Sequence, residues 1–463
     1  MKYILFLIGL CFFASCTPTS KMSKTSPIQY LEVPENRTKQ NGKSIQLAYT
    51  ILEPVEETNK EPIVVLQGGP GGPTLFMTEF FVQSPLHQDR AIIFMDQRGS
   101  GKSNAISENL GTEIMQVLAK DYSLEEEAKE IEQVLDAGKA IATKAGYDFS
   151  AYNSRENAAD FEALRKHLGY EQWNLFGGSY GSRLGLTIMR DFPEGVRSAI
   201  FSGVFGVESN LYADFNSNFN RALTEVFEGC KEDANCNAQF SNLKTDFFAL
   251  LNQLQTSPYH AKFRGQAFVI NAQDLMLIIH QLLYGKESIA YIPVFIKAFN
   301  KPKSKLINEI LEHVLSTLDI INLAMYLSVN TYEEIPFNGY DSFQKDLTEN
   351  TAFPVAPAFF SSIAKYHKNW HPYRAPKVEN QRVVSDIPVL LLNGQFDPIT
   401  PPSNAESANQ NLSNGYTAEF KGEGHNFFNA CFMQISSSFL NNKFQKPDFS
   451  CTIQEDSIEW KLK

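Results

Sequence analysis

The 463-residue sequence has no internal repeat, no low-complexity tract and no excess of basic residues. Its 41 lysines and arginines are outnumbered by 52 aspartates and glutamates, and no basic cluster stands out, so we expect no nucleic-acid partner. Cysteine is also scarce: none of the 6 cysteines has a zinc-site spacing, and we expect no metal. With 43% hydrophobic residues, the composition is that of a globular protein with a large core.

Long apolar runs are missing too, apart from one at the start of the chain. A lysine-containing start precedes the apolar run from Tyr3 to Phe13, which is too short for a comfortable membrane span. We predict an export signal over residues 1–15. The small residues before Cys16 resemble a bacterial lipoprotein signal, in which this cysteine becomes the lipid-modified first residue. Residues 16–27 would then form a tether to a membrane of the cell envelope, whereas an ordinary cleaved signal is the alternative.

Four cysteines remain for the mature chain, an even number that suits an oxidising compartment. Cys230 and Cys236 are near neighbours and would bridge one local loop. Cys431 with Cys451 would staple the C-terminal segment. Other pairings stay open, because four cysteines allow three connectivities.

Short apolar runs that precede glycine-rich turns predict buried strands of a parallel sheet. The runs are Ile63 to Leu66, Ala91 to Met95, Trp173 to Phe176, Ser198 to Phe201 and Pro388 to Leu392, with a further strand at Tyr416 to Phe420. Predicted helices lie at Leu124 to Lys144, Ser154 to Leu168, Ser179 to Arg190 and Phe427 to Leu440. This alternation predicts an α/β fold with a doubly wound, mostly parallel sheet.

The pattern changes in the middle of the chain. Between residues 204 and 386 the sequence has helical stretches and no rhythm of parallel strands. The stretches include Leu223 to Phe227, Asp274 to Leu283 and Leu306 to Leu327. We therefore predict a core in two parts, residues 28–203 and 387–463, interrupted by a helical cap at residues 204–386.

The strongest chemical motif runs from Gly177 to Gly181 and has Ser179 at its centre. It follows a predicted strand and opens a predicted helix, which is the setting of the nucleophile elbow of α/β hydrolases. The elbow holds its serine in a strained backbone conformation, so only small neighbours fit. Ser179 is the predicted nucleophile.

A second glycine motif, Gln67 to Gly72, directly follows the strand that ends at Leu66. Acyl transfer develops negative charge on the carbonyl oxygen of the substrate, and main-chain N–H groups stabilise that charge. One donor comes from such a glycine turn and the other from the residue after the nucleophile. We assign these roles to Gly69 and Tyr180.

A serine nucleophile needs a base and an orienting acid, which follow it in the order acid, then histidine, in α/β hydrolases. Asp397 comes after the strand ending at Leu392, and His425 comes after the next strand. We predict Asp397 as the acid and His425 as the general base, a chemistry that needs no cofactor. His280, within an apolar stretch, is expected to be a core or interface residue, and Glu423 a solvated turn residue.

With these motifs the sequence resembles the prolyl aminopeptidase and tripeptidyl aminopeptidase family of serine peptidases. The resemblance rests on Gly68 to Gly72, Asp96 to Ser103, Gly177 to Ser182 and the surroundings of Asp397 and His425. It implies removal of residues or short peptides from free peptide N-termini, with short peptides as substrates. The four mature-chain cysteines resemble those of the secreted tripeptidyl-type members. Gln67 departs from the family, because prolyl aminopeptidases usually carry histidine there.

The implied activity also needs carboxylates in the cap to hold the substrate ammonium group. Glu208, Asp274 and Glu287 lie in the predicted cap, but none belongs to a motif, so the substrate-binding role stays unassigned. An esterase or lipase on the same scaffold is the main alternative, since the same triad cleaves esters. A non-catalytic binding protein of the envelope is a further alternative, which the complete set of triad residues disfavours.

Overall fold

The computed structural model describes residues 25–39, 42–56, 58–349, 358–453 and 458–463. The predicted signal peptide, Cys16 and most of the predicted tether lie outside the described residues. Among the helices that the structure describes, none is long and apolar enough to cross a membrane.

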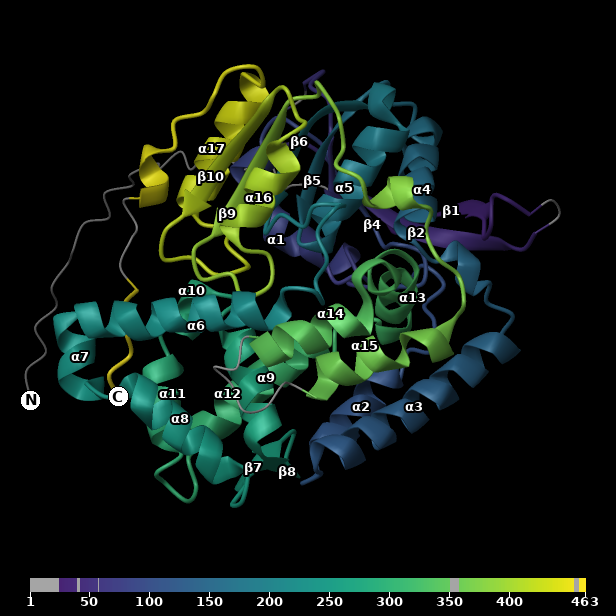
Figure 1. Ribbon diagram of the computed structural model, residues 1–463. Coiled ribbons are helices and arrows are strands. Elements are labelled where there is room, and N and C mark those ends of the chain that lie inside the picture. Colours follow the sequence, from purple (N-terminus) through teal and green to yellow (C-terminus); the bar gives the residue numbers. More distant parts are fainter. Residues whose placement is uncertain (1–24, 40–41, 57, 350–357, 454–457) are drawn as a thin grey trace, which may run out of the picture.

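An eight-stranded sheet forms the centre of the upper body in Figure 1. Its strands lie in the order β1-β2-β4-β3-β5-β6-β9-β10. They are β1 (Gln29–Pro34), β2 (Ser44–Leu52), β3 (Ile63–Leu66), β4 (Ile92–Met95), β5 (Trp173–Gly178), β6 (Val196–Ser202), β9 (Val389–Gly394) and β10 (Gly415–Phe420). β2 pairs antiparallel with β1 and β4, and all the other neighbouring strands are parallel. The mostly parallel sheet predicted from the sequence is thus confirmed.

Helices cover both faces of this sheet, which explains why inner strands such as β3 and β4 are apolar throughout. They are α1 (Thr78–Val82) and α17 (Ala430–Asn441) on one face, and α4 (Ser154–His167), α5 (Tyr180–Asp191) and α16 (Pro402–Asn409) on the other. On the first face Phe94 packs in one hydrophobic cluster with Phe81 and Phe432. On the second, Leu175 shares a cluster with Phe161. Every residue of β3 and β4 is buried.

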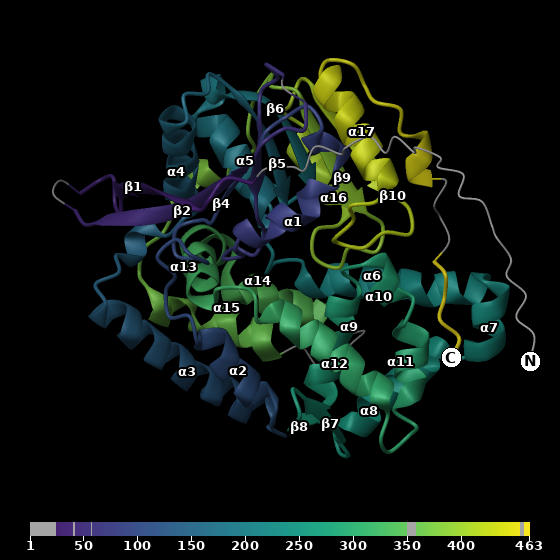
Figure 2. The same ribbon diagram turned by 180° about the vertical axis from the view of Figure 1, so that it is seen from behind.

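The chain between β6 and β9 folds into a second, mostly helical body, which lies beneath the sheet in Figures 1 and 2. We call residues 204–386 the insert. Its elements are α6 (Phe215–Glu232), α7 (Ala234–Phe240), α8 (Leu243–Leu254), β7 (Tyr259–Phe263), β8 (Gln266–Ile270), α9 (Ala272–Leu282), α10 (Lys286–Ile289), α11 (Ile292–Ala298), α12 (Lys305–Leu318), α13 (Leu323–Glu333), α14 (Ile335–Glu349) and α15 (Ala358–Trp370). Two helices from between β4 and β5, α2 (Leu110–Leu118) and α3 (Leu124–Lys144), pack beside it, α3 against α15.

Side-chain caps fix the starts of two helices between β4 and β5, α3 and α4. Ser123 and Glu126 form a capping box at the start of α3, each satisfying a main-chain N–H of the other. The side chain of Asn153 accepts a hydrogen bond from the N–H of Glu156 and caps α4. Both helices begin where the sequence pattern predicts.

Part of the structure differs from the sequence prediction. The β1–β2 pair and the β7–β8 hairpin were not predicted, and the single helix expected from residue 306 to 327 is two helices, α12 and α13. The break has a local cause, because the Asn322 side chain accepts a hydrogen bond from the N–H of Met325 and caps α13. The Asn322 N–H donates instead to the carbonyl oxygen of Gly71, in the glycine turn after β3, at 3.0 Å.

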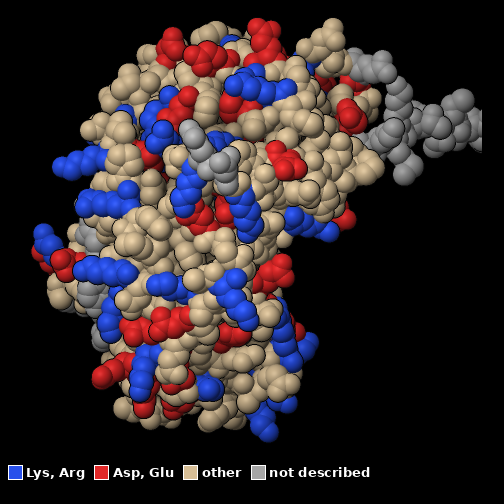
Figure 3. Space-filling model, turned by 90° about the vertical axis from the view of Figure 1, so that its right-hand side faces the viewer, with Lys and Arg blue, Asp and Glu red and all other residues tan. Residues whose placement is uncertain are grey.

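The surface carries charges of both signs. On the face shown in Figure 3, lysines and arginines lie among aspartates and glutamates instead of gathering in one patch. This face therefore has no basic stripe of the kind that follows a nucleic-acid backbone.

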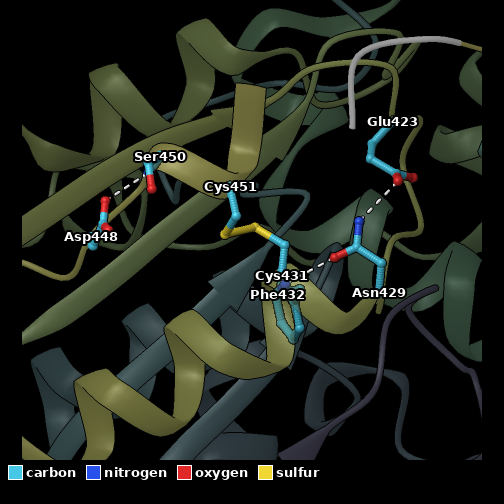
Figure 4. The surroundings of a disulfide bond; sticks show 7 residues. All are labelled: Glu423, Asn429, Cys431, Phe432, Asp448, Ser450 and Cys451. Atoms are coloured by element: carbon cyan, nitrogen blue, oxygen red, sulfur yellow. Dashed lines mark hydrogen bonds between the residues drawn. A yellow bond between two sulfur atoms is a disulfide. The ribbon is translucent and has the colours of Figure 1, made fainter. Parts of the chain in front are cut away.

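Both predicted disulfide pairs are bonded in the structure. Cys230 in α6 joins Cys236 in α7 across 6 residues of sequence. Cys431 in α17 joins Cys451 across 20 residues, and so ties the C-terminal segment to the first turn of that helix (Figure 4). Each bond closes a short loop, which restricts the unfolded chain.

Candidate active site

Ser179 stands on a sharp turn between β5 and α5. Its φ is 55°, in the left-handed region, and its N–H donates to the carbonyl oxygen of Ser202 at the end of β6. The flanking glycines are sterically required, since a Cβ on Gly177 would lie 2.5 Å from the Gly181 oxygen and a Cβ on Gly181 would lie 1.9 Å from the Leu66 oxygen. The strained turn is the elbow expected around a nucleophilic serine.

Asp397 and His425 follow two neighbouring parallel strands, β9 and β10, at the same edge of the sheet. The Nδ1 atom of His425 lies 2.7 Å from the Oδ2 atom of Asp397 and forms a hydrogen bond with it. Both side chains are buried, with 5% of His425 exposed and none of Asp397. Ligand and catalytic groups gather at this edge of open α/β sheets, and the acid and the base predicted from sequence meet here.

Thr400 joins this pair, although sequence reasoning missed it. Its hydroxyl donates to Oδ2 of Asp397 at 2.6 Å and lies 3.0 Å from Nδ1 of His425. The N–H groups of Ile399 and Thr400 donate to the other oxygen, Oδ1, of Asp397. The aspartate thus has hydrogen-bond partners on both oxygens, which fixes its orientation toward the imidazole.

The surroundings of Asp397 favour its ionised form. Burial by itself would raise the pKa of this carboxyl, but the charge of His425 and the hydrogen bonds from His425 and Thr400 hold the pKa below its ordinary value. An ionised aspartate can stabilise the imidazolium that forms when His425 accepts a proton.

The imidazole of His425 also lies against the end of β6, close to the elbow. A Cβ on Gly203 would lie 2.9 Å from Cε1 of His425, and the preceding residue, Ser202, accepts the N–H of Ser179. The Ser179 hydroxyl and the His425 ring, both within the described chain, do not share a hydrogen bond in this structure. Hydrogen bonds of this kind are often long in substrate-free enzymes and tighten when the substrate binds.

The glycine turn after β3 faces Ser179. A Cβ on Gly68 would lie 3.0 Å from the Cβ of Ser179, so the main chain of the turn passes directly over the serine. The N–H of Gly68 donates to its neighbour Gln67, whereas those of Gly69 and Tyr180 donate to no other described residue. The two predicted oxyanion donors therefore have N–H groups that no described acceptor occupies.

The segment from Asp96 to Ser103, which had no mechanism at the level of sequence, supports this turn. Oδ1 of Asp96 accepts the N–H groups of Thr74 and Leu75, at 2.6 and 3.0 Å, and Oδ2 accepts the N–H of Lys102. The carboxylate thereby ties the chain that leaves the glycine turn to the end of β4. We assign Asp96 a supporting role for the oxyanion donors.

Arg98 of the same segment is completely buried and links distant parts of the chain through hydrogen bonds. Its Nε and Nη2 atoms donate to the two carboxylate oxygens of Asp160 at 2.7 and 2.8 Å. Its Nη1 atom donates to the carbonyl oxygens of Glu35 and Ala151. Burial lowers the pKa of Arg98, but Asp160 and Glu156 outweigh that effect and raise it, so the guanidinium keeps its charge.

Other sequence candidates lie elsewhere. Glu208 accepts a hydrogen bond from Ser407 at 2.7 Å. Asp274 is buried in the capping box of α9, and Glu287 is exposed on α10. None of these three carboxylates has a described contact with the triad.

The sequence predictions for Glu423 and His280 have different outcomes. The interpretation of Glu423 as a solvated residue is wrong, since it is only 5% exposed and accepts a hydrogen bond from Asn429, the cap of α17 (Figure 4). His280 is a core residue, as predicted, and stacks on Phe215 with 4.9 Å between ring centroids. Burial lowers the pKa of His280 to about 3, so its ring is neutral at physiological pH.

A cavity of about 740 Å³ lies between the insert and the loop that carries His425. Its lining includes Tyr284 and Glu287 from the insert and Glu423, Asn426 and Phe428 from the loop. The triad residues do not line it, so we assign it no substrate.

Two parts of the chain match known families. Residues 61–232 match the family described as alpha/beta hydrolase fold, and residues 356–451 match the family described as TAP-like protein. The first match contains Ser179 and the second contains Asp397 and His425. The two matches together therefore include all three residues of the candidate triad.

Curated relatives agree with this assignment at low identity. "Putative hydrolase YuaR" of Escherichia coli (strain K12) is 23% identical over 423 residues, which cover 86% of this chain and 80% of that protein. "Probable proline iminopeptidase" of Leptolyngbya boryana is 28% identical over 148 residues, 32% of either chain. "Serine protease Hip1" of Mycobacterium tuberculosis (strain CDC 1551 / Oshkosh) is 27% identical over 234 residues, 48% of this chain and 45% of that protein.

The matches to the two peptidases thus span less than half of those proteins, whereas the match to the hydrolase spans most of both chains. The chain therefore has the α/β-hydrolase fold, its residues 356–451 match the TAP-like family, and parts of its sequence are similar to proline iminopeptidases and to serine protease Hip1.

Proposed function

We propose that this hydrolase is a serine aminopeptidase that acts on short peptides with a free N-terminus. Ser179 attacks the scissile carbonyl while His425 accepts its proton, and Asp397 orients and stabilises the imidazolium. The N–H groups of Gly69 and Tyr180 bind the developing oxyanion. His425 then returns the proton to the leaving amine, and water hydrolyses the acyl-enzyme by the same route.

One observation carries the catalytic part of this proposal. The hydrogen-bonded pair of Asp397 and His425 lies at the strand edge where Ser179 occupies a strained elbow. Such strain persists only where the surrounding structure enforces it, and it is characteristic of functional sites. The peptidase names of the relatives support the choice of peptides as substrates.

Glu334 is our candidate for binding the substrate ammonium. Burial raises the pKa of Glu334 to about 7; the charge of Arg183 acts to lower this pKa, and the charge of Glu333 acts to raise it. Oε2 of Glu334 accepts the N–H of Leu211 at 3.2 Å, whereas its buried Oε1 has no hydrogen-bond partner among the described residues. Arg183 belongs to the first turns of α5, just after the nucleophile. A substrate ammonium would satisfy the unpartnered oxygen, since buried carboxylates require a partner.

We further propose export to the bacterial cell envelope and attachment to a membrane through a lipid on Cys16. The two disulfides support export, because such bonds persist in oxidising compartments. Metabolic labelling with a palmitate analogue would test the anchor, with label expected on the full chain and absent from Cys16→Ala.

The substrate class is tested by comparing free and N-acetylated aminoacyl- and tripeptidyl-arylamides with p-nitrophenyl esters. We expect turnover of the free arylamides and loss of turnover on acetylation. Glu334→Gln should raise KM for free arylamides and leave ester hydrolysis unchanged, whereas Ser179→Ala should abolish both activities. Turnover of esters alone would replace the aminopeptidase with an esterase.

A further inference from the structure

The side chain of Arg221, on α6 of the insert, reaches the loop that carries the acid of the triad. Its Nη1 atom donates to the carbonyl oxygen of Gln395 at 2.7 Å, and its Nη2 atom donates to the carbonyl oxygen of Asp397 itself at 2.5 Å. A guanidinium suits this task because its planar fork presents donors to two acceptors at once. Figures 1 and 2 show α6 running beneath the loops that follow β9 and β10.

The core holds the same loop from the opposite side. The N–H of Gln395 donates to the carbonyl oxygen of Phe420, and the N–H of Phe396 donates to the carbonyl oxygen of Glu423. Both acceptors belong to the segment that leads to His425. The acid loop therefore lies between the base loop and Arg221. Because the carboxylate of Asp397 is bound to the N–H groups of its own loop, a shift of that main chain moves the carboxylate relative to His425.

The insert also contacts the base loop. The N–H of Asn426 donates to the carbonyl oxygen of Tyr284 at 2.6 Å, and the rings of Tyr284 and His425 lie 4.7 Å apart. A Cβ on Gly424 would lie 2.2 Å from the carbonyl oxygen of Leu283, so the two main chains touch. Only glycine fits at this contact.

The third contact is at the glycine turn that carries the oxyanion donor. Asn322 of the insert donates its N–H to the carbonyl oxygen of Gly71, and a Cβ on Gly71 would lie 2.5 Å from the Asn322 oxygen. The insert thus touches the acid loop, the base loop and the oxyanion turn at separate points.

We propose that the insert aligns the catalytic loops, and that Arg221 is the positioning residue through which it holds Asp397. The inference rests on the proposed serine-hydrolase chemistry but on no particular substrate. Arg221 acts on the main chain of Asp397 and touches no reacting atom. Its side chain is 32% exposed, so a shorter side chain there leaves room for water instead of an empty core cavity.

The test compares fluorophosphonate labelling of full-length Arg221→Ala, Arg221→Lys and wild-type protein, because labelling needs an activated serine and no specific substrate. We expect the second-order labelling rate to fall at least about tenfold in both variants, since small misplacements of catalytic groups cost up to about 100-fold. The melting temperature should stay near that of the wild type. Added guanidinium chloride at millimolar concentration should restore part of the labelling rate of Arg221→Ala only.

Glu225→Gln is the matched control. It removes the 2.7 Å ion pair that Glu225 makes with Nη1 of Arg221 and leaves both carbonyl contacts, so its labelling rate should equal that of the wild type. Wild-type labelling rates in the Arg221 variants would overturn the inference and leave the proposed function intact. A loss of labelling that follows a lower melting temperature and resists guanidinium would also overturn it. If the wild type itself resisted labelling, the proposed function would fail, and the positioning role with it.

Discussion

At the scale of single residues, Thr400 connects the acid to the base. Replacing it with valine keeps the volume and removes the hydroxyl that donates to Oδ2 of Asp397. Hydrogen bonds to charged groups contribute about 1.5–3 kcal/mol, so kcat/KM of Thr400→Val should fall roughly tenfold to 100-fold. Steady-state kinetics on the best ester or arylamide substrate measures this. Thr400→Ser, which keeps the oxygen, should retain most activity, and equal rates in both variants would contradict the role.

The residues of the candidate triad were predictable from sequence because each belongs to a motif with a steric or topological reason. Ser179 lies between obligatory glycines, and Asp397 and His425 follow recognisable strands. Thr400 and Arg221 carry no such signal. They matter through contacts between distant parts of the chain, and only the folded structure shows these.

At the scale of elements, Asp96 at the end of β4 supports the glycine turn after β3. Its carboxylate accepts main-chain N–H groups of Thr74, Leu75 and Lys102, and an asparagine would turn an NH₂ group toward at least one of them. Loss of an oxyanion donor costs about 10²–10³ in kcat, so Asp96→Asn should lower kcat by about 10² and leave KM within a few-fold. Asp89→Asn, at a partly exposed position before β4, should change neither constant.

The strands of the parallel sheet were predictable because burial on both faces leaves continuous apolar runs, such as β3 and β4. The strand β1 escaped prediction because only two of its six residues are buried, which leaves it without an apolar run. The hairpin of β7 and β8 is likewise largely exposed. The break between α12 and α13 depends on Asn322, which caps α13 through a local hydrogen bond and contacts the distant Gly71 through its N–H.

At the scale of the whole molecule, stability should depend on a buried acid between α3 and α9. Burial raises the pKa of Glu127 to about 7, although a hydrogen bond from Gln273 acts to lower it. Burial and the charges of Glu127 and Asp121 likewise raise the pKa of Asp274. Between pH 4.5, the ordinary value, and about 7, the folded chain keeps the Glu127 proton that the unfolded chain loses. The contribution of Glu127 to the free energy of unfolding therefore falls as pH rises through this window, by up to about 1.4 kcal/mol per pH unit, and levels off above it.

Urea denaturation at a series of pH values measures this slope. Glu127→Gln, which cannot ionise, should make the slope less steep between pH 4.5 and about 7, a window to which Glu334 also contributes. Glu130→Gln, on the same helix but partly exposed, should keep the wild-type slope. Identical slopes in wild type and Glu127→Gln would show that this acid does not retain its proton on folding.

The central claim is that Ser179 is a nucleophile activated by His425 and Asp397. The most direct measurement is the site and rate of covalent modification by a fluorophosphonate, read by peptide mapping and mass spectrometry of the full-length protein. The account predicts one adduct, on Ser179, which is absent from Ser179→Ala and forms at least about 10³-fold more slowly in His425→Ala and Asp397→Asn. An adduct on another residue, or labelling of Ser179 at an unchanged rate without His425, would contradict it.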